Sequence, residues 1–251
     1  MAVARLTGTV TMVTVMDDPL STKALYKLLS FLSPAFPIGA FTYSHGLENA
    51  VENGSVTHAA SLVEWLTSIM WCGAGRSDAI LLKEAHQAAL QGDRETLIEL
   101  RELGLALQPS KERSLETCAQ GTAFFKAVTQ SWPPSGESPA ILAFNDLSEG
   151  STIWPYPAAV GLCCAAHGVP VEAATIGFLQ AFAANIVSAA IRTVPLGQTE
   201  AQTVLAKLEF TIFQVAEEAA RSDIGDLGTS TFLADIASMK HETQYSRLFR
   251  S

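Results

Sequence analysis

The sequence predicts an all-α fold, a single-domain helical bundle of roughly ten helices. Most of the 251-residue chain repeats apolar side chains every three to four positions, which is the spacing of a helix with one buried face. No alternating strand pattern recurs after residue 17. Because 48% of the residues are apolar and 16% are charged, such helices can bury a sizeable core.

The chain begins with residues 1–20, which we expect to form a flexible extension. This segment has one early arginine and an apolar run broken by threonines, so it lacks the leucine-rich core of a signal peptide. The all-helical domain is expected over residues 21–239, and a C-terminal tail over 240–251. A Pro-Pro-Ser-Gly stretch at 133–136 is interpreted as a surface loop within this domain, because both of its flanks have the same composition.

Residues 33–48, SPAFPIGAFTYSHGLE, contain two prolines, two glycines and three aromatic residues. Because prolines and glycines interrupt helices, this segment cannot form a long helix. Aromatic rings on a stiff loop either fill a core or anchor a partner with little loss of entropy, and composition alone favours neither. Ser44 and His45 are adjacent in the chain, so they are interpreted as loop residues and not as a nucleophile and base that meet across a fold.

Three helices are expected in the middle of the chain. His58 has the place of a cap before the first, Asp93 and Ser110 stand where the N-caps of the other two should be, and His86 is interpreted as a surface residue. The expected buried faces are Leu62, Trp65 and Ile69 in the first helix, Leu97, Leu100, Gly104 and Leu107 in the second, and Leu115, Cys118, Thr122 and Phe125 in the third.

Two long helices are expected after residue 170. The first follows Pro170 and ends near Thr193, because Pro195 forces the residue before it into an extended shape. The second opens with a capping-box pattern, TEAQ at 199–202. Its expected buried face is Leu205, Leu208, Ile212, Val215 and Ala219.

The uncharged run at 173–191 is long enough to cross a membrane. It contains Gln180, Asn185 and many small residues, and neither a second span nor a flanking basic cluster accompanies it. We therefore expect a buried helix of a soluble protein.

Charge and motifs exclude several functions. The net charge is -9 and the basic residues are scattered, which argues against nucleic-acid binding. There is no Gly-x4-Gly-Lys-Ser/Thr loop and no Gly-x-Gly-x-x-Gly turn, so the chain should not bind GTP or NAD by itself. After His241 and Glu242, Tyr245 stands where a zinc protease needs its second histidine. We expect no catalytic residues.

Four cysteines lie at spacings unlike a disulfide framework, which indicates reduced thiols in a cytoplasmic protein. Cys163, Cys164 and His167 stand at i, i+1 and i+4, so one cysteine and the histidine share a helix face and could bind nickel, copper or zinc. Two ligands do not close a site, and small buried cysteines beside alanines usually serve packing. We expect no metal here; the alternative is a metal-dependent small-molecule enzyme that uses the Cys163/His167 face.

The end of the chain, MKHETQYSRLFRS from Met239, is locally basic on an acidic protein. Its apolar residues Tyr245, Leu248 and Phe249 alternate with arginines such as Arg247. A segment of this kind either docks on its own body or is a binding arm. We expect it to be mobile in the free chain and to become ordered on a partner.

Four motifs make the chain similar to the UreF family of urease accessory proteins: LLSFLSPAFPIGAFTYSHGLE at 28–48, YPAAVGLCCAAHGV from 156, SAAIRTVPLGQTEAQ at 188–202 and DIASMKHETQYSRLFRS from 235. The resemblance implies an all-helical, non-catalytic protein without a cofactor that forms a homodimer. It also implies that the chain joins UreD, also called UreH, and the GTPase UreG in an assembly that delivers nickel to apo-urease.

The resemblance also implies where partners bind. The 41–48 loop and the 192–198 turn belong to the side that faces the GTPase, and the tail belongs to the side that faces UreD. Arg192 could reach the GTPase or could cap its own helix, and partner contact is favoured over transition-state catalysis. The implied partner-binding residues are Phe41, Tyr43, Ser44, Glu48, Arg192, Gln198, His241, Glu242, Tyr245, Arg247, Leu248 and Phe249.

Overall fold

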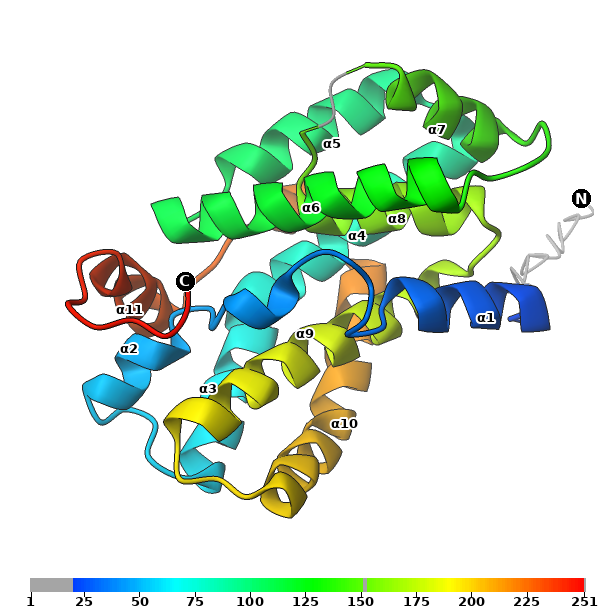
Figure 1. Cartoon of the computed structure of the whole chain (residues 1–251). Coiled ribbons are helices and arrows are strands. Elements are labelled where there is room, and N and C mark those ends of the chain that lie inside the picture. The colour runs from blue at the N-terminus through cyan, green and yellow to red at the C-terminus, as the bar shows by residue number, and fades with distance from the viewer. Residues whose placement is uncertain (1–19, 151–152, 251) are drawn as a thin grey trace, which may run out of the picture.

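A computed structural model describes residues 20–150 and 153–250, and over these residues it contains eleven α-helices, two 3-10 turns and no strand (Figure 1). This confirms the predicted all-α fold. Of the N-terminal extension expected at residues 1–20, residues 1–19 lie outside the described part of the chain. The elements are α1 Thr22–Phe31, η1 Ala40–Thr42, α2 Leu47–Glu52, α3 Ala59–Cys72, α4 Ala74–Gln91, α5 Arg94–Ala106, α6 Lys111–Ser131, α7 Pro139–Ser148, α8 Tyr156–Ala166, α9 Val171–Thr193, α10 Gln198–Arg221, η2 Ile224–Asp226 and α11 Phe232–His241.

Helix α4 runs through the middle of the molecule, between two groups of helices (Figure 1). Helices α5, α6, α7 and α8 lie on one side of it, and α2, α3, α9 and α10 lie on the other. Two hydrophobic clusters largely correspond to these groups, and both α4 and α9 contribute side chains to each of them. The core is therefore continuous through α4.

Helix α8 is enclosed by its neighbours, and all of its residues from Pro157 to Ala166 are buried. It meets α4 at Gly161, where an added Cβ would lie 2.2 Å from the carbonyl oxygen of Leu82. On α6, a Cβ at Gly121 would lie 2.1 Å from the carbonyl oxygen of Trp154, just before α8. Only glycine permits such close backbone contact. We call the contacts at Gly161 and Gly121 the glycine seam.

The predicted helix starts are largely confirmed. The side chains of Asp93 and Ser110 accept hydrogen bonds from the first turns of α5 and α6, and His58 caps α3. The predicted start of α10 is wrong by two positions. This helix begins at Gln198 after Gly197, whose lack of a side chain leaves the backbone without a side-chain cap.

The helix predicted between Pro170 and Thr193 is α9, and its bounds are confirmed. By length and composition it could cross a membrane, but half of its most apolar window is buried inside the fold. It packs against α4, α8 and α10. The predicted core helix is thus what the structure contains. The apolar face predicted for α10 is also buried, apart from the half-buried Leu205.

Three predictions about side chains in the middle of the chain are wrong. Helix α6 exposes Leu115 and buries Glu112, Arg113 and Glu116, because these charged groups find partners inside the fold. His86 is buried and not at the surface, since its Nε2 lies 2.8 Å from a backbone carbonyl oxygen. Leu107 is exposed because it lies just past the end of α5.

The tail folds back onto the body of the molecule after α11 (Figure 1). The backbone N–H of Arg250 donates to the carbonyl oxygen of Thr42 at 2.8 Å. Phe249 is 4% exposed and belongs to the second hydrophobic cluster. This differs from the mobile tail expected for the free chain. Of the two alternatives for this segment, docking on its own body is the one observed.

Candidate partner-binding site at the C-terminal clasp

The loop before α2 directs aromatic rings both inward and outward. Phe36 and Tyr43 are buried, whereas Phe41 is 66% exposed. Gly39 has a left-handed backbone with φ of 71°, and the η1 turn that follows it carries Phe41. Core filling therefore applies to Phe36 and Tyr43, and the anchoring of a partner stays a prediction for the exposed Phe41.

The chain enters α2 through two left-handed residues, His45 with φ of 59° and Gly46 with φ of 75°. A Cβ on Gly46 would lie 2.9 Å from the backbone nitrogen of Ser238, so α11 lies directly against this turn. Ser44 is buried here. The turn brings Glu48, in the first turn of α2, next to the end of α11.

Glu48 fastens the tail to α2. Its Oε1 accepts a hydrogen bond from the backbone N–H of Leu248 at 2.7 Å, and its Oε2 accepts one from the N–H of Phe249 at 3.0 Å. The same Oε2 lies 3.0 Å from Nε2 of His241. Hydrogen bonds to an ionised carboxylate are stronger than those between neutral groups. One side chain thus holds two consecutive backbone amides of the tail.

His241 connects this carboxylate to a second one on α6. Its ring is fully buried, and its Nδ1 lies 2.8 Å from Oε2 of Glu112. The other oxygen of Glu112 accepts from Nη1 of Arg247 at 3.1 Å. Burial raises the pKa of Glu112, while His241 and Arg247 act to lower it. We call this set of residues the clasp: Glu48, Glu112, His241, Arg247, Leu248 and Phe249.

Arg192 ties the end of α9 to the same place. Its Nη2 donates to the carbonyl oxygen of Phe41 at 2.9 Å, and its guanidinium carbon lies 4.2 Å from the centroid of the Phe249 ring. Its Nε also lies 3.4 Å from the carbonyl oxygen of Ser188, one turn back in the helix. The guanidinium is therefore engaged within the chain, by the tail and η1 as well as by its own helix.

The structure brings together most of the predicted partner-binding residues. Some of them belong to the side expected to face the GTPase and others to the side expected to face UreD. Gln198 is exposed at the start of α10 and makes none of the clasp contacts. Tyr245 is fully exposed, and Glu242 accepts from the backbone N–H of Lys111 at 3.1 Å. The residues that meet are Phe41, Glu48, Arg192, His241, Arg247, Leu248 and Phe249.

Sequence reasoning missed Glu112. A signal was present, because Glu112, Arg113 and Glu116 place three charged residues within about one turn of a helix, on the side that carries Phe124. Charged residues on a buried face require partners inside the fold. The pattern would have identified α6 as a helix with internal ion pairs, although it would not have named His241 as the partner.

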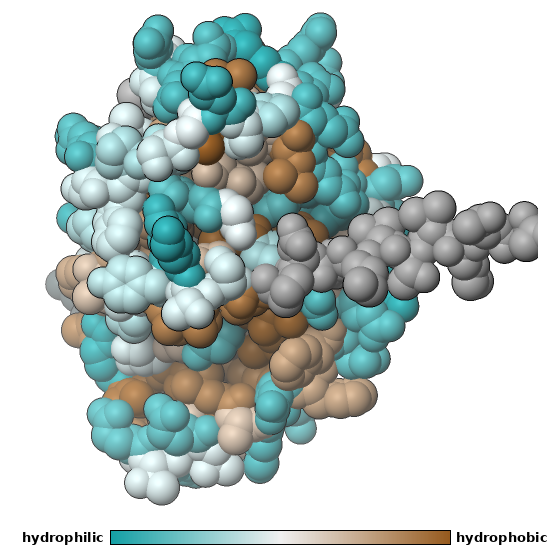
Figure 2. All heavy atoms as spheres, turned by 90° about the vertical axis from the view of Figure 1, so that its right-hand side faces the viewer, coloured by the Kyte–Doolittle hydropathy of each residue, from teal (hydrophilic) through white to brown (hydrophobic). Residues whose placement is uncertain are grey.

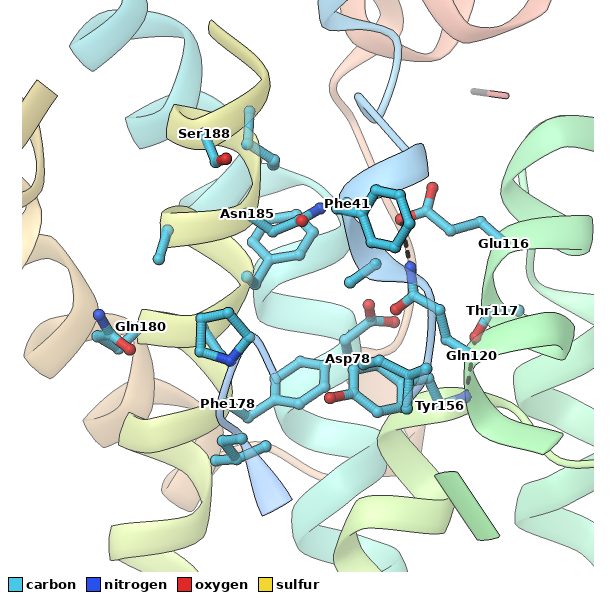
Figure 3. A pocket seen from close by; sticks show the side chains of 18 of the residues that line it. Phe41, Asp78, Glu116, Thr117, Gln120, Tyr156, Phe178, Gln180, Asn185 and Ser188 are labelled. Carbon is cyan, nitrogen blue, oxygen red and sulfur yellow. Dashed lines mark hydrogen bonds between the residues drawn. The ribbon is translucent and has the colours of Figure 1, made fainter. Parts of the chain in front are cut away.

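A cavity of about 250 Å³ opens beside the same loop, between α6, α9 and η1 (Figure 3). Phe41 lies over it, Asn185 and Phe178 project from α9, and Gln120 faces them from α6 (Figure 3). Tyr156, at the start of α8, forms part of the opposite wall. The lining is mostly apolar, with amide and carboxylate groups at a few points.

Asp78, Arg113 and Glu116 contribute the charged part of this lining. Nη1 of Arg113 lies 2.6 Å from Glu116, and Nη2 lies 3.8 Å from Asp78. Burial raises the pKa of Asp78 to about 6, although Arg113 opposes the shift. Burial also acts to raise the pKa of Glu116, but Arg113 and His45 outweigh it and the pKa falls to about 2. Burial, reinforced by Arg113, lowers the pKa of His45 to about 4. At neutral pH the group is an internal ion pair beside an uncharged imidazole.

The weak metal candidates do not form a centre. Burial raises the pKa of the Cys163 thiol, and it raises that of Cys164 to about 12, which disfavours the thiolate form that binds metals. Nδ1 of His167 lies 2.7 Å from Nζ of Lys27. Among the described residues, no three His, Cys, Asp or Glu side chains gather to hold a metal ion. Neither Cys163 nor His167 lines the cavity, so packing is the interpretation that the geometry supports.

The fold and the clasp define an all-helical protein whose C-terminal tail is held on the body of the molecule by two carboxylates. Comparison with known sequences gives this class a name. A family model described as UreF matches residues 56–209. Proteins named urease accessory protein UreF are similar over nearly the whole chain: one from Rhodopseudomonas palustris strain BisB5 is 48% identical over 91% of this chain and 91% of its own length. One from Bradyrhizobium sp. strain ORS 278 is 47% identical over 91% and 92%, respectively. The chain belongs to the UreF family of urease accessory proteins.

Proposed function

We propose that this chain is a non-catalytic cytoplasmic adaptor between UreD and the GTPase UreG, needed for maturation of the nickel centre of urease. The observation that carries the proposal is an apolar surface on α11 and the tail, next to the clasp and to the exposed ring of Phe41. Membership of the family suggests which proteins are the partners. The apolar surface suggests where on this chain they bind.

The outward face of α11 is apolar. Phe232 is 73% exposed and Leu233 77% exposed, and Ile236 and Met239 continue the stripe one and two turns later. Tyr245 and Leu248 of the tail, also exposed, add to it. A surface helix normally directs polar residues to solvent, and a contiguous apolar patch marks an interaction site. We assign this face to UreD.

The GTPase side is proposed to include Phe41 and the 192–198 turn. The carbonyl oxygen of Phe41 accepts a hydrogen bond from Arg192, and the same guanidinium lies over the ring of Phe249. One arginine therefore contacts both the η1 turn and the tail. Because the guanidinium of Arg192 is already held by Phe41 and Phe249, its role is proposed to be positioning of the contact surface and not transition-state catalysis in the GTPase.

A homodimer is proposed through the face formed by α1, α9 and α10. Figure 2 looks onto the side where α1 lies and shows brown, apolar atoms gathered below the centre of the view. Leu29 of α1 and Phe210 of α10 are 65% and 73% exposed. Gly177 of α9 lies against α1, and the neighbouring Ile176 lines a groove with Phe213 of α10. We propose that the exposed apolar residues of these three helices contact a second copy.

Copurification tests this proposal. In the variant Leu233→Asp/Met239→Asp, capture of UreD by the tagged chain should fall at least about tenfold, because two charges replace apolar contacts. Leu142→Asp on α7 is the matched control, since Leu142 is 56% exposed and α7 lies on the opposite side of the molecule from α11 (Figure 1). Phe41→Asp should retain UreD and lose UreG. Light scattering on the same preparations should show Phe210→Glu shifted from dimer to monomer.

Retention of UreD at wild-type affinity by the double aspartate variant would contradict the assigned face. Equal loss of UreD in the Leu142→Asp control would show that the effect is not local to α11. Urease activity in cells that express each variant then reports whether the binding defects prevent nickel delivery.

A further inference from the structure

His241 is a buried imidazole with a carboxylate at each ring nitrogen. Its Nδ1 lies 2.8 Å from Glu112 and its Nε2 lies 3.0 Å from Glu48. A neutral imidazole donates from one nitrogen only, and an ionised carboxylate can only accept. A neutral ring between two ionised carboxylates would therefore direct a lone pair at a carboxylate oxygen on one side. The observed geometry requires one further proton in this triad.

The charges around the ring balance when that proton is present. Glu48 on α2 and Glu112 on α6 bring two negative charges, and Arg247 from the tail brings a positive charge at 3.1 Å from Glu112. Glu242 also acts on Glu112, and its Oε1 accepts a hydrogen bond from the backbone N–H of Lys111. With the extra proton, the two carboxylates face two positive charges. Without it, Arg247 alone must balance both in a buried setting.

The proton matters to the tail because Glu48 has two tasks. The same carboxylate that contacts His241 accepts the backbone N–H groups of Leu248 and Phe249. If the ring nitrogen next to it no longer donates, Glu48 and the imidazole repel each other. A shift of Glu48 to relieve this repulsion weakens the two bonds that hold the tail. The other tautomer of His241 directs the same repulsion at Glu112, which holds Arg247 of the tail. Protonation of the triad and closure of the tail are therefore coupled.

We propose that closing the C-terminal tail binds one proton, shared by Glu48, His241 and Glu112, so that the tail is held at lower pH and released as the pH rises. The direction follows from linkage. A group that binds its proton more tightly in the closed form stabilises that form at low pH, and this stabilisation is lost as the pH rises. The raised pKa of Glu112 acts in the same direction, because burial makes the protonated form more favourable in the folded chain.

Hydrogen exchange of the full-length free chain tests this inference without either partner, so its outcome is separate from that of the proposed function. Exchange rates of the 242–250 peptide are measured by mass spectrometry from about pH 6 to pH 9 and divided by the intrinsic rates. Protection of the amides of Leu248 and Phe249 should fall by at least about tenfold over this range. Peptides from α8 serve as the internal reference, and their protection should not change.

Glu112→Gln is the decisive variant. Its amide group can donate to a neutral His241 while its carbonyl oxygen accepts from Arg247, so the triad needs no extra proton. The tail of this variant should stay protected across the pH range, with no slope. Glu209→Gln on the exposed face of α10 makes the same change of charge away from the clasp and should retain the wild-type slope.

Constant protection of the wild-type tail over the range would overturn the proposal. So would a Glu112→Gln tail that still loses its protection as the pH rises, because the proton would then be bound elsewhere. His241→Gln provides a second check. Its amide can donate to only one carboxylate side at a time, so the tail should be less protected than in the wild type at the low end of the range.

Discussion

The glycine seam and the clasp each join parts of the chain that are far apart in sequence, and they do so by opposite means. At the seam, backbones touch at Gly161 and Gly121, and the surrounding side chains are buried and mostly apolar. At the clasp, a carboxylate on α2 holds two amides of the tail some 200 residues away. The glycine seam has no room for a larger side chain at Gly161 or Gly121. The clasp depends on hydrogen bonds and ion pairs made by two carboxylates. The comparison teaches that this fold separates what packs its core from what holds its C-terminal tail.

The largest expected effect is at the seam. In Gly161→Ala, the added Cβ would lie 2.2 Å from the carbonyl oxygen of Leu82, so α4 and α8 must move apart. We expect the free energy of unfolding to fall by roughly 3 kcal/mol or more, measured by urea denaturation. Gly197→Ala is the control, because nothing lies within 4 Å of the position that its new Cβ would occupy and its backbone φ is -76°. Equal stability of the two variants would show that the seam is not tightly packed.

The next effect is expected at the clasp, and it should stay local. Phe249→Ala removes a buried ring from the second cluster and the surface on which Arg192 lies. Closure of the tail should weaken by about 3 kcal/mol, seen as faster hydrogen exchange of residues 242–250. The exchange of α8 should not change. Tyr245→Ala, at a fully exposed position, is the control. If Phe249→Ala lowered the stability of α8 as much as that of the tail, seam and clasp would form a single cooperative unit.

The smallest effect is expected from Arg192→Ala. It removes a cation–π contact with Phe249 and a hydrogen bond to the carbonyl oxygen of Phe41, so closure of the tail should weaken by about 1 kcal/mol. Hydrogen exchange of the tail measures this loss. Arg192→Lys should recover part of it, since an ammonium retains the contact with the ring. An Arg192→Ala chain with a fully protected tail but a reduced effect on the GTPase would favour the arginine as a group presented to that partner.

Elements bounded by local signals could be predicted from the sequence. Proline marks both ends of α9, and its bounds were correct. Ser110 and Asp93 likewise identified the starts of α6 and α5, because an N-cap depends on side chains within the same turn. The capping pattern at 199–202 failed for α10, since Gly197 takes the N-cap position and its carbonyl oxygen accepts the first helical hydrogen bond from Ala201, which places Thr199 inside the first turn.

The clasp could be predicted only in part. The family motifs pointed to Glu48, His241 and Phe249, but the contacts between them join segments roughly 200 residues apart, and no local pattern encodes such a pairing. Periodicity also misplaced the buried face of α6, because it counts apolar side chains and overlooks buried ion pairs. Glu112 was missed for this reason, and the tail was expected to be mobile because its partner carboxylates were not recognised.

Helix α9 has a consequence for how the protein is made. A ribosome synthesises the chain from its N-terminus, so a helix as apolar as α9 could be mistaken, when it emerges, for a segment destined for a lipid bilayer. Its packing partners α1, α2, α3, α4 and α8 all precede it in the chain, and of its main partners among the described helices only α10 follows. Most of the surface that covers α9 is therefore already synthesised when α9 appears. The order of the helices along the chain therefore shortens the time during which this long apolar helix lacks the neighbours that cover it.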